Sequence, residues 1–401
     1  ASNRLTIAQA IDEALQHNLS LFAERANLTI ADAQMIAARL RPNPVFSFSA
    51  DHLDWLGTGF NAENNGGPPE IAWRVDVPLE RGGKREARIA LASVVRSAAE
   101  AQFADSVRTL RQDVTLACVD VMAARSSREL VVENLRTFED LVRVNRARLT
   151  AGSIPASETR RSEVAMLQFR ATVVRADLDL AAASARLRTL LGRPPGDTLA
   201  IAGDLRGAEP PAAVDAGRLR QLAIESRPDL RALQLGQARS TADLRLQEAL
   251  GRIDYTVGAE YRRQQGIAGR GNSIGVFFSA PLPLSSRNQG EIARATGDLT
   301  QADRQIAARQ AQITADVESA YHEFVTMRDL VESIERDLLG PATKARDTAD
   351  YTYRAGGASL LELLDAQRAF NDTMQSYLDA EAGLRRAATR LNGTVGTEVV
   401  P

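Results

Sequence analysis

The feature that most constrains this chain is an internal repeat, in which one half of the sequence resembles the other. The segment IAWRVDVPLERGGKREAR (71–88) parallels VFFSAPLPLSSRNQGEIA (276–293): each passes from alternating apolar residues through Pro-Leu into a polar turn and a helix-forming stretch. Farther along, LTAGSIPASE (149–158) parallels YRAGGASLLE (353–362). An internal sequence repeat predicts a structural unit that occurs twice in the chain.

We therefore predict two structural repeats, 1–200 and 214–393, joined by a linker at 193–213 and followed by a C-terminal tail at 394–401. In each copy the predicted order is helix, strand, loop, strand, very long helix, tight turn and long helix. The predicted strands cover about 44–55, 70–78, 253–263 and 272–282, and the predicted long helices about 84–149, 157–192, 287–352 and 359–392. Gly192 and Gly393 are predicted to lie just past helix ends.

The long helices have the clearest pattern. From Val107 to Leu149, apolar residues recur at three- and four-residue spacing, with Arg128 and Asn145 as the polar exceptions. Extended back to Lys84, this predicts one helix of about 100 Å, at 1.5 Å per residue. The second copy repeats the pattern until Gly340-Pro341, where proline predicts an interruption.

Four short segments instead alternate with a period of two. In 71–77, Trp73 and Val75 face one way, and Arg74 and Asp76 the other. Such strands suit either amphipathic hairpins packed on the helices of a soluble α+β protein, or a membrane barrel with a water-filled lumen. Gly/Asn-rich connections at 56–69 and 264–271 favour external loops of a barrel. Four strands cannot close a barrel, but three chains would supply twelve.

Composition excludes several function classes. The 49 Lys+Arg residues are balanced by 51 Asp+Glu, so the chain lacks the positive surplus of a nucleic-acid binder. The single cysteine, Cys118, excludes a disulfide framework and a multi-thiolate metal site within one chain, and the chain has only three histidines. No catalytic motif appears, so we predict no enzyme activity, no cofactor and no metal site. No apolar run is long enough for a transmembrane helix.

On the duplication, the strand pairs, the long helices and the turn motif YRAGGASLLELLDAQRAF (353–370), the chain resembles the TolC family of outer-membrane efflux ducts along essentially its whole length. VPLERGGKREARIALA (77–92) and SLLELLDAQRAF (359–370) look like the CzcC/CusC branch, the outer-membrane components of heavy-metal resistance-nodulation-division pumps. The resemblance implies an α+β membrane protein: a homotrimer with a twelve-stranded transmembrane β-barrel and a periplasmic α-barrel of long coiled-coil-like helices.

The resemblance also implies a place and a function. The protein would lie in outer-membrane lipid of a Gram-negative bacterium, with a periplasmic extension. It would passively conduct heavy-metal cations such as zinc, cobalt, nickel, cadmium or copper. A periplasmic adaptor and an inner-membrane resistance-nodulation-division pump would supply energy and selectivity. Two alternatives stay open: a duct of the same family for organic compounds, and a soluble coiled-coil periplasmic adaptor or scaffold.

By resemblance, the turns 150–157 and 354–359 form the periplasmic tip and meet the adaptor. The contact candidates are Arg148, Leu149, Gly152, Ser153, Tyr353, Arg354, Gly356 and Ser359. A purely structural interpretation competes with this one. The two glycines permit positive φ at helix ends, and Ser359 is suited to an N-cap.

The resemblance also implies an acidic constriction built from Glu158, Glu362 and Asp365, which three chains would bring near one axis. The competing interpretation is a capping box, since Ser359 and Glu362 have the required spacing. In the barrel, charged strand positions are expected to line the lumen: Arg74, Asp76, Asp254, Glu260 and Arg262.

Overall fold

The computed structural model describes residues 4–53, 55–57, 69–205, 215–266 and 269–400. The expected loops at 56–69 and 264–271 and the expected linker at 193–213 therefore lie partly outside the described residues. The chain divides into two compact units, a helical unit (1–25, 102–230 and 308–401) and a strand unit (26–101 and 231–307). Each unit takes segments from both halves of the sequence.

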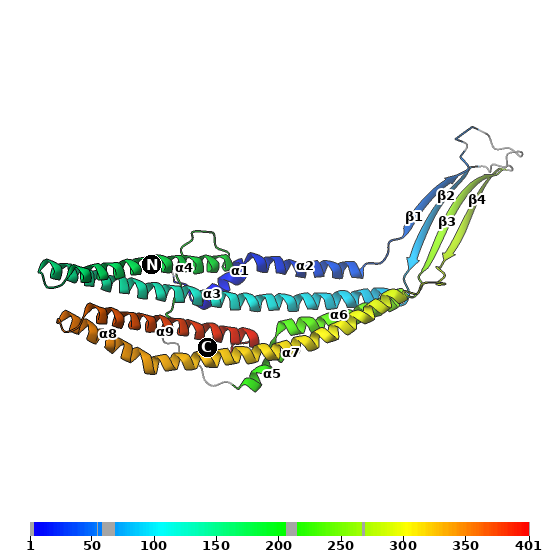
Figure 1. Cartoon of the computed structure of the whole chain (residues 1–401). Coiled ribbons are helices and arrows are strands. Elements are labelled where there is room, and N and C mark those ends of the chain that lie inside the picture. Colours follow the sequence, from blue (N-terminus) through cyan, green and yellow to red (C-terminus); the bar gives the residue numbers. More distant parts are fainter. Residues whose placement is uncertain (1–3, 54, 58–68, 206–214, 267–268, 401) are drawn as a thin grey trace. The chain divides into compact units, whose positions relative to one another are not determined.

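Both halves show the same order of elements, except that the long helix of the second half is divided (Figure 1). The first half contains α1 (Ile7–His17), α2 (Leu19–Arg39), β1 (Val45–Asp51), β2 (Glu70–Leu79), α3 (Lys84–Thr150) and α4 (Ala156–Leu190). The second half contains α5 (Ala216–Ser226), α6 (Pro228–Leu250), β3 (Tyr255–Gly266), β4 (Gly269–Ser279), α7 (Gln289–Ser333), the π-helical turn η1 (Ile334–Leu338), α8 (Leu339–Arg354) and α9 (Leu360–Val395).

The expected single first helix of each half is in fact two helices. Asn18 leaves the helical conformation, and its side-chain oxygen accepts a hydrogen bond from Leu21 N at 2.9 Å, which caps the new helix. Arg227 is extended as well, because the proline at 228 disfavours a helical residue before it. Local capping and proline sterics therefore override the continuous apolar pattern.

α3 confirms the predicted very long helix, with 67 residues from Lys84 to Thr150. Its sequence contains neither glycine nor proline, so nothing local ends the helix early. In α7 the predicted interruption also occurs, as the turn η1 just before Pro341. Proline has no N–H for the carbonyl four residues earlier, and the backbone accommodates that loss by widening locally. Among the described residues, no helix is long and apolar enough to cross a membrane.

The core of the helical unit gathers small and branched residues from α1, α3, α4 and α9, including Ala14, Val114, Leu187 and Leu378. Cys118 is fully buried in this cluster, and burial raises the pKa of its thiol to about 12, so it packs as an apolar side chain.

Gly192 follows α4 with φ +70°, as predicted, but the prediction for Gly393 was wrong. Gly393 lies inside α9, and Gly396 with φ +90° ends that helix instead. A Cβ at Gly393 would lie 2.3 Å from the side-chain oxygen of Gln112 on α3. This glycine therefore permits close helix packing rather than termination.

The strand unit carries a four-stranded antiparallel sheet in the order β1-β2-β3-β4 (Figure 1). β2 and β3 pair the two halves of the sequence, with Trp73 opposite Tyr261. β1 and β4 are the edge strands. Their outer backbone groups have no strand partner within the described chain, so the sheet is open on both sides.

A buried charge cluster generates the first prediction. Asp229, whose side chain is 12% exposed, accepts hydrogen bonds from Arg227 at 2.9 Å and Arg309 at 2.7 Å. Burial alone would raise the pKa of Asp229, but the hydrogen bonds from Arg227 and Arg309 outweigh it and lower the pKa from 3.8 to about 2. The ionised carboxylate therefore contributes roughly 2 kcal/mol of stability above about pH 4, which is lost as the pH falls towards 2.

We expect Asp229→Asn to lower the free energy of unfolding by about 2 kcal/mol at pH 7, and the difference from the wild type to shrink between about pH 4 and 2. Thermal unfolding followed by circular dichroism across this pH range measures that difference. The matched control is Asp372→Asn on α9, at an exposed site. A deficit that stays constant with pH would contradict the linkage.

Candidate functional site

The sheet has one apolar and one charged face, and in this chain the apolar face is exposed. Ile274 and Val276 of β4 are 81% and 80% exposed. Directly opposed residues extend this face in three rows, two across all four strands and one across β2 to β4: Phe48, Trp73, Tyr261 and Ile274; Phe46, Val75, Ala259 and Val276; and Val77, Val257 and Phe278. Such a continuous apolar face marks a surface that water does not cover in the functional state.

The opposite face of the sheet carries paired charges. Arg74 pairs with Asp76 at 2.8 Å and lies 4.1 Å from the ring centre of Phe277. Gly258 leaves room for this pair, because a Cβ there would lie 2.2 Å from the Asp76 carboxylate. The face is therefore polar but internally neutralised, as expected for a wetted lumen.

A second cluster on the charged face joins β2 and β3. Arg262 pairs with Glu260 at 2.9 Å and with Glu70 at 2.8 Å. Glu260 is only 9% exposed, so Arg262 is the cation that compensates its burial. The structure thus brings together four of the five predicted lumen residues on one face.

The fifth lumen candidate, Asp254, lies elsewhere. It precedes β3, where it accepts hydrogen bonds from the Lys84 ammonium at 2.6 Å and the Arg81 backbone N–H at 2.9 Å. Burial would raise the pKa of Asp254, but these two hydrogen bonds outweigh it and hold the pKa below its ordinary value. Alternation placed Asp254 on a strand, whereas the structure uses it to join the start of α3 to the start of β3.

The two predicted tip turns share one geometry. Gly152 and Gly356 have φ of +71° and +80°, and Ser153 N and Gly357 N each donate to a carbonyl five residues earlier, at Arg148 and Thr352. This is the Schellman pattern that ends helices with a left-handed glycine. The structural interpretation of the two glycines is therefore sufficient to explain them.

Three tip residues meet around α3 and α8. The Arg148 guanidinium donates to the carbonyls of Tyr353 at 3.3 Å and Arg354 at 2.6 Å. The Tyr353 hydroxyl donates to the side-chain oxygen of Asn145 at 2.7 Å. Burial raises the pKa of Tyr353, so its hydroxyl keeps the proton that it donates. These bonds fasten the end of α8 to α3.

The position of Tyr353 corrects one prediction. Its side chain is 3% exposed, packed with Phe138 and Leu360, so it is not available as an adaptor contact. Asn145, its partner, is one of the two polar exceptions in the apolar pattern of α3, and this exception was the signal for a buried hydrogen bond. At the tip, the exposed candidates are Leu149, Gly152, Ser153, Arg354, Gly356 and Ser359.

The acidic candidates differ in what they contact. The Glu362 carboxylate accepts a hydrogen bond from Ser359 N at 2.8 Å, while the Ser359 hydroxyl accepts one from Glu362 N, so the pair forms the predicted capping box. Asp365 is exposed, and within the described residues its carboxylate has no hydrogen bond or ion pair. Glu158 is half-buried in the first turn of α4.

Possible metal ligands do not gather in the structure. Among the described residues, no group of three or more His, Cys, Asp or Glu side chains is placed to hold a metal ion. A cleft of about 510 Å³ lies between α3, α8 and α9, but its charged lining is mixed, with Arg346 paired to Asp347 and Arg354 to Asp350. The arrangement suits a surface for passage or docking rather than a ligating site.

The buried tip contact generates the second prediction. Tyr353→Phe leaves the Asn145 side-chain oxygen without a donor, so we expect a loss of about 1–3 kcal/mol in the free energy of unfolding. The double variant Asn145→Leu/Tyr353→Phe removes both polar partners and is expected to recover part of that loss. Tyr351→Phe, at an exposed site of the same helix, is the control. Thermal unfolding of these three variants and of Asn145→Leu checks the prediction. A double variant that loses as much stability as the two single variants added together, or more, would contradict the pairing.

Known proteins resemble this chain both in sequence and in structure. The chain is 26% identical to the cobalt-zinc-cadmium resistance protein CzcC of Cupriavidus metallidurans, over 99% of this chain and 91% of that protein. It is 24% identical to the nickel-cobalt-cadmium resistance protein NccC of Alcaligenes xylosoxydans, over 73% of this chain and 63% of that protein. The solved structure of CusC is similar over 98% of this chain and 92% of the CusC chain, with a TM-score of 0.78 at 18% identity.

The family model for outer membrane efflux proteins matches residues 10–193 and 219–397, most of the chain. This match excludes the soluble scaffold and confirms the TolC-like fold, the outer-membrane location and a transport rather than an enzymatic role. The chain belongs to the outer membrane efflux protein family.

Proposed function

We propose that three copies of this chain form an efflux channel, with twelve strands closing a barrel in the outer membrane and the long helices forming a periplasmic tunnel. The exposed apolar face of the sheet carries this proposal. Lipid is the environment that such a face requires, and lipid does not tolerate the open edges of β1 and β4. Pairing β4 of one copy with β1 of the next would satisfy both constraints.

Two neighbouring residues on opposite faces of β4 test this orientation. Ile274→Arg puts a cation on the proposed lipid face. It is expected to lower the folding stability of the protein in the bilayer by up to about 2–4 kcal/mol, depending on how deep residue 274 lies in the membrane. Ser273→Arg puts the same cation on the other face, opposite Arg262 and its two glutamates, and is expected to be tolerated. Outer-membrane yield and the mass of the detergent-solubilised assembly measure the difference. Equal behaviour of the two variants, or a monomer that stays soluble without detergent, would contradict the barrel.

For the cargo, we propose heavy-metal cations such as zinc, cobalt, nickel, cadmium or copper, passing without being ligated. Two relatives, CzcC and NccC, are named for resistance to such metals. Organic compounds are the second candidate cargo, because ducts for them share the same fold pattern. A gene deletion, complemented with the wild type and tested for growth on each metal and on antibiotics, separates the two. Unaltered metal tolerance in a strain without a redundant exporter would count against the metal assignment.

The proposed partners are a periplasmic adaptor and an inner-membrane resistance-nodulation-division pump. The exposed side chains of the turns after α3 and α8 offer a surface for the adaptor, with Arg354 and Ser153 as polar contacts. The energy for transport then comes from the pump, since the chain has no nucleotide-binding motif.

The proposed acidic constriction can be tested without disturbing the helix. Glu362→Gln keeps the side chain that a capping box accepts, and Asp365→Asn removes a second charge at an exposed site. We expect the double variant to lower the preference for cations over anions, because fewer carboxylates attract cations near the axis.

The measurement is the reversal potential of single channels in a bilayer under a salt gradient. Ser359→Ala is the matched control, because it weakens the cap by about 1 kcal/mol and leaves both charges in place. A double variant with an unchanged reversal potential would assign Glu362 to capping and Asp365 to a solvated surface.

A further inference from the structure

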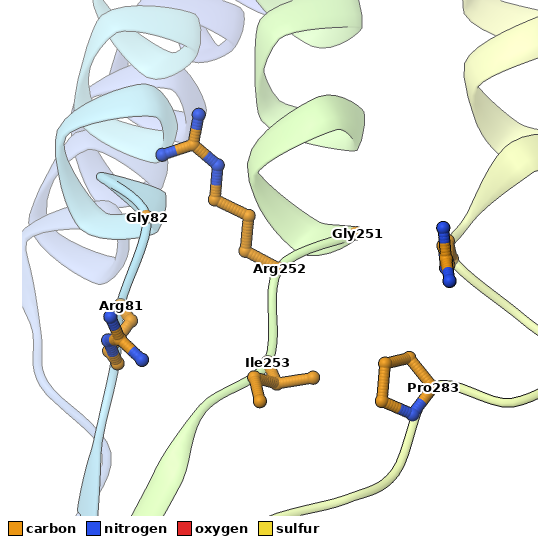
Figure 2. Close-up of a pocket in the computed structure, with 7 residues that line it drawn as sticks. Arg81, Gly82, Gly251, Arg252, Ile253 and Pro283 are labelled. Atoms are coloured by element: carbon orange, nitrogen blue, oxygen red, sulfur yellow. The ribbon is translucent and has the colours of Figure 1, made fainter.

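A pocket of about 400 Å³ lies in the strand unit, where the sheet gives way to the helices (Figure 2). Three connections line it: β2 to α3, α6 to β3, and β4 to α7. Each connection contributes one arginine, namely Arg81, Arg252 and Arg287. The fold thus lines one pocket with three cations, one from the first half of the sequence and two from the second.

The positive charge of this arginine pocket is not neutralised by the chain itself. Within the described residues, none of the three guanidinium groups forms an ion pair with a carboxylate. Two carboxylates in the same connections are committed to other cations, since Asp254 binds Lys84 and Glu80 binds Arg88. The pocket therefore presents unbalanced positive charge towards an anion from outside the chain.

Two glycines shape the pocket. A Cβ at Gly82, where φ is +76°, would lie 2.5 Å from Cδ of Arg252. A Cβ at Gly251 would lie 2.6 Å from the backbone oxygen of Arg287. Figure 2 shows Arg81 and Arg252 coming from neighbouring connections beside these glycines. The missing side chains allow the arginine-bearing segments to approach each other closely.

The pocket lies at the end of the apolar face of the sheet. Leu79, the last residue of β2, opposes Tyr255 on that face, and the Tyr255 ring lies 5.1 Å from the ring of Phe278. Arg81 follows two residues after Leu79, and its guanidinium lies 4.3 Å from the centre of the Tyr255 ring. An aromatic ring followed by a cation is the arrangement found where acyl chains give way to headgroups.

We propose that the arginine pocket binds the phosphate headgroup of an anionic phospholipid in the leaflet that borders the helices. The planar guanidinium forks of arginine match phosphate oxygens in pairs. Leu282 and Leu284 flank Pro283 of the pocket and are 78% and 88% exposed, so they offer an apolar surface to acyl chains that a free anion would not need. This inference rests on the proposed exposure of the apolar face to lipid.

The test uses the assembled protein in nanodiscs that contain equal amounts of phosphatidylglycerol and phosphatidylcholine. The protein is released from the nanodiscs, and native mass spectrometry identifies the lipids that stay bound to it. We expect the wild type to retain phosphatidylglycerol selectively, and each of Arg81→Gln, Arg252→Gln and Arg287→Gln to lower that preference roughly fivefold. Arg252→Lys, which keeps the charge, is expected to retain more of the preference than Arg252→Gln.

The matched controls each remove one charge from the same unit. Arg231, Arg239 and Arg304 are exposed and do not line the pocket, so the single variants Arg231→Gln, Arg239→Gln and Arg304→Gln are each expected to keep the wild-type preference. An equal loss in these controls would reduce the effect to general surface charge and overturn the proposal. Binding of inorganic phosphate without any preference for phosphatidylglycerol over phosphatidylcholine would overturn the lipid assignment in favour of a free-anion site.

Two further outcomes separate this inference from the proposed function. A conducting trimer with no preference for phosphatidylglycerol would overturn the lipid site and leave the channel standing. If pocket variants dissociate the trimer without changing lipid retention, the pocket arginines instead bind a carboxylate of a second copy of the chain. A monomer soluble without detergent would overturn both proposals together.

Discussion

The rest of the structure depends on one small sheet that exposes its apolar face instead of burying it. Its charged face is internally paired, through Arg74 with Asp76 and Arg262 with Glu70 and Glu260, while its apolar face is open. A sheet in a water-soluble protein buries its apolar face against helices. The two apolar clusters of the helical unit bury their own residues, and neither contains a residue of the sheet. The proposed environment of the exposed face is outer-membrane lipid, which agrees with membership of an outer-membrane family.

The duplication explains why the two halves of the chain use the same few element types. The N-caps of α4 and α9, Pro155 and Ser359, lie 204 residues apart, as do the left-handed glycines of the two tip turns. The copies then differ in chemistry. Pro155 provides no side-chain cap, whereas Ser359 and Glu362 form a complete capping box. The second copy has Asp365 at the position that corresponds to Arg161 in the first. The two tips therefore share a backbone geometry and present different charges.

Several elements could be predicted because their causes are local. The absence of glycine and proline over 84–150 allows a helix of 67 residues, and period-two alternation identifies all four strands. Other features depend on contacts that no local pattern contains. In the sequence, Asn145 is a polar exception in an apolar pattern; in the structure, its side chain accepts a hydrogen bond from Tyr353, 208 residues later. Gly393 looked like a helix end, although it makes room for Gln112. Asp254 looked like a strand residue, although Lys84 holds it beside α3.

The amino-acid sequence by itself determined the duplicated plan, the helix lengths and the two-faced strands, because backbone propensity and side-chain period act over neighbouring residues. Tertiary structure alone decided which charges are structural and which are available. Glu362 is engaged in a capping box and Asp254 in an ion pair with Lys84, whereas Asp365 and the three pocket arginines have no ion-pairing partner among the described residues. That distinction depends on how close distant segments approach, and distance between segments follows from packing rather than from residue type.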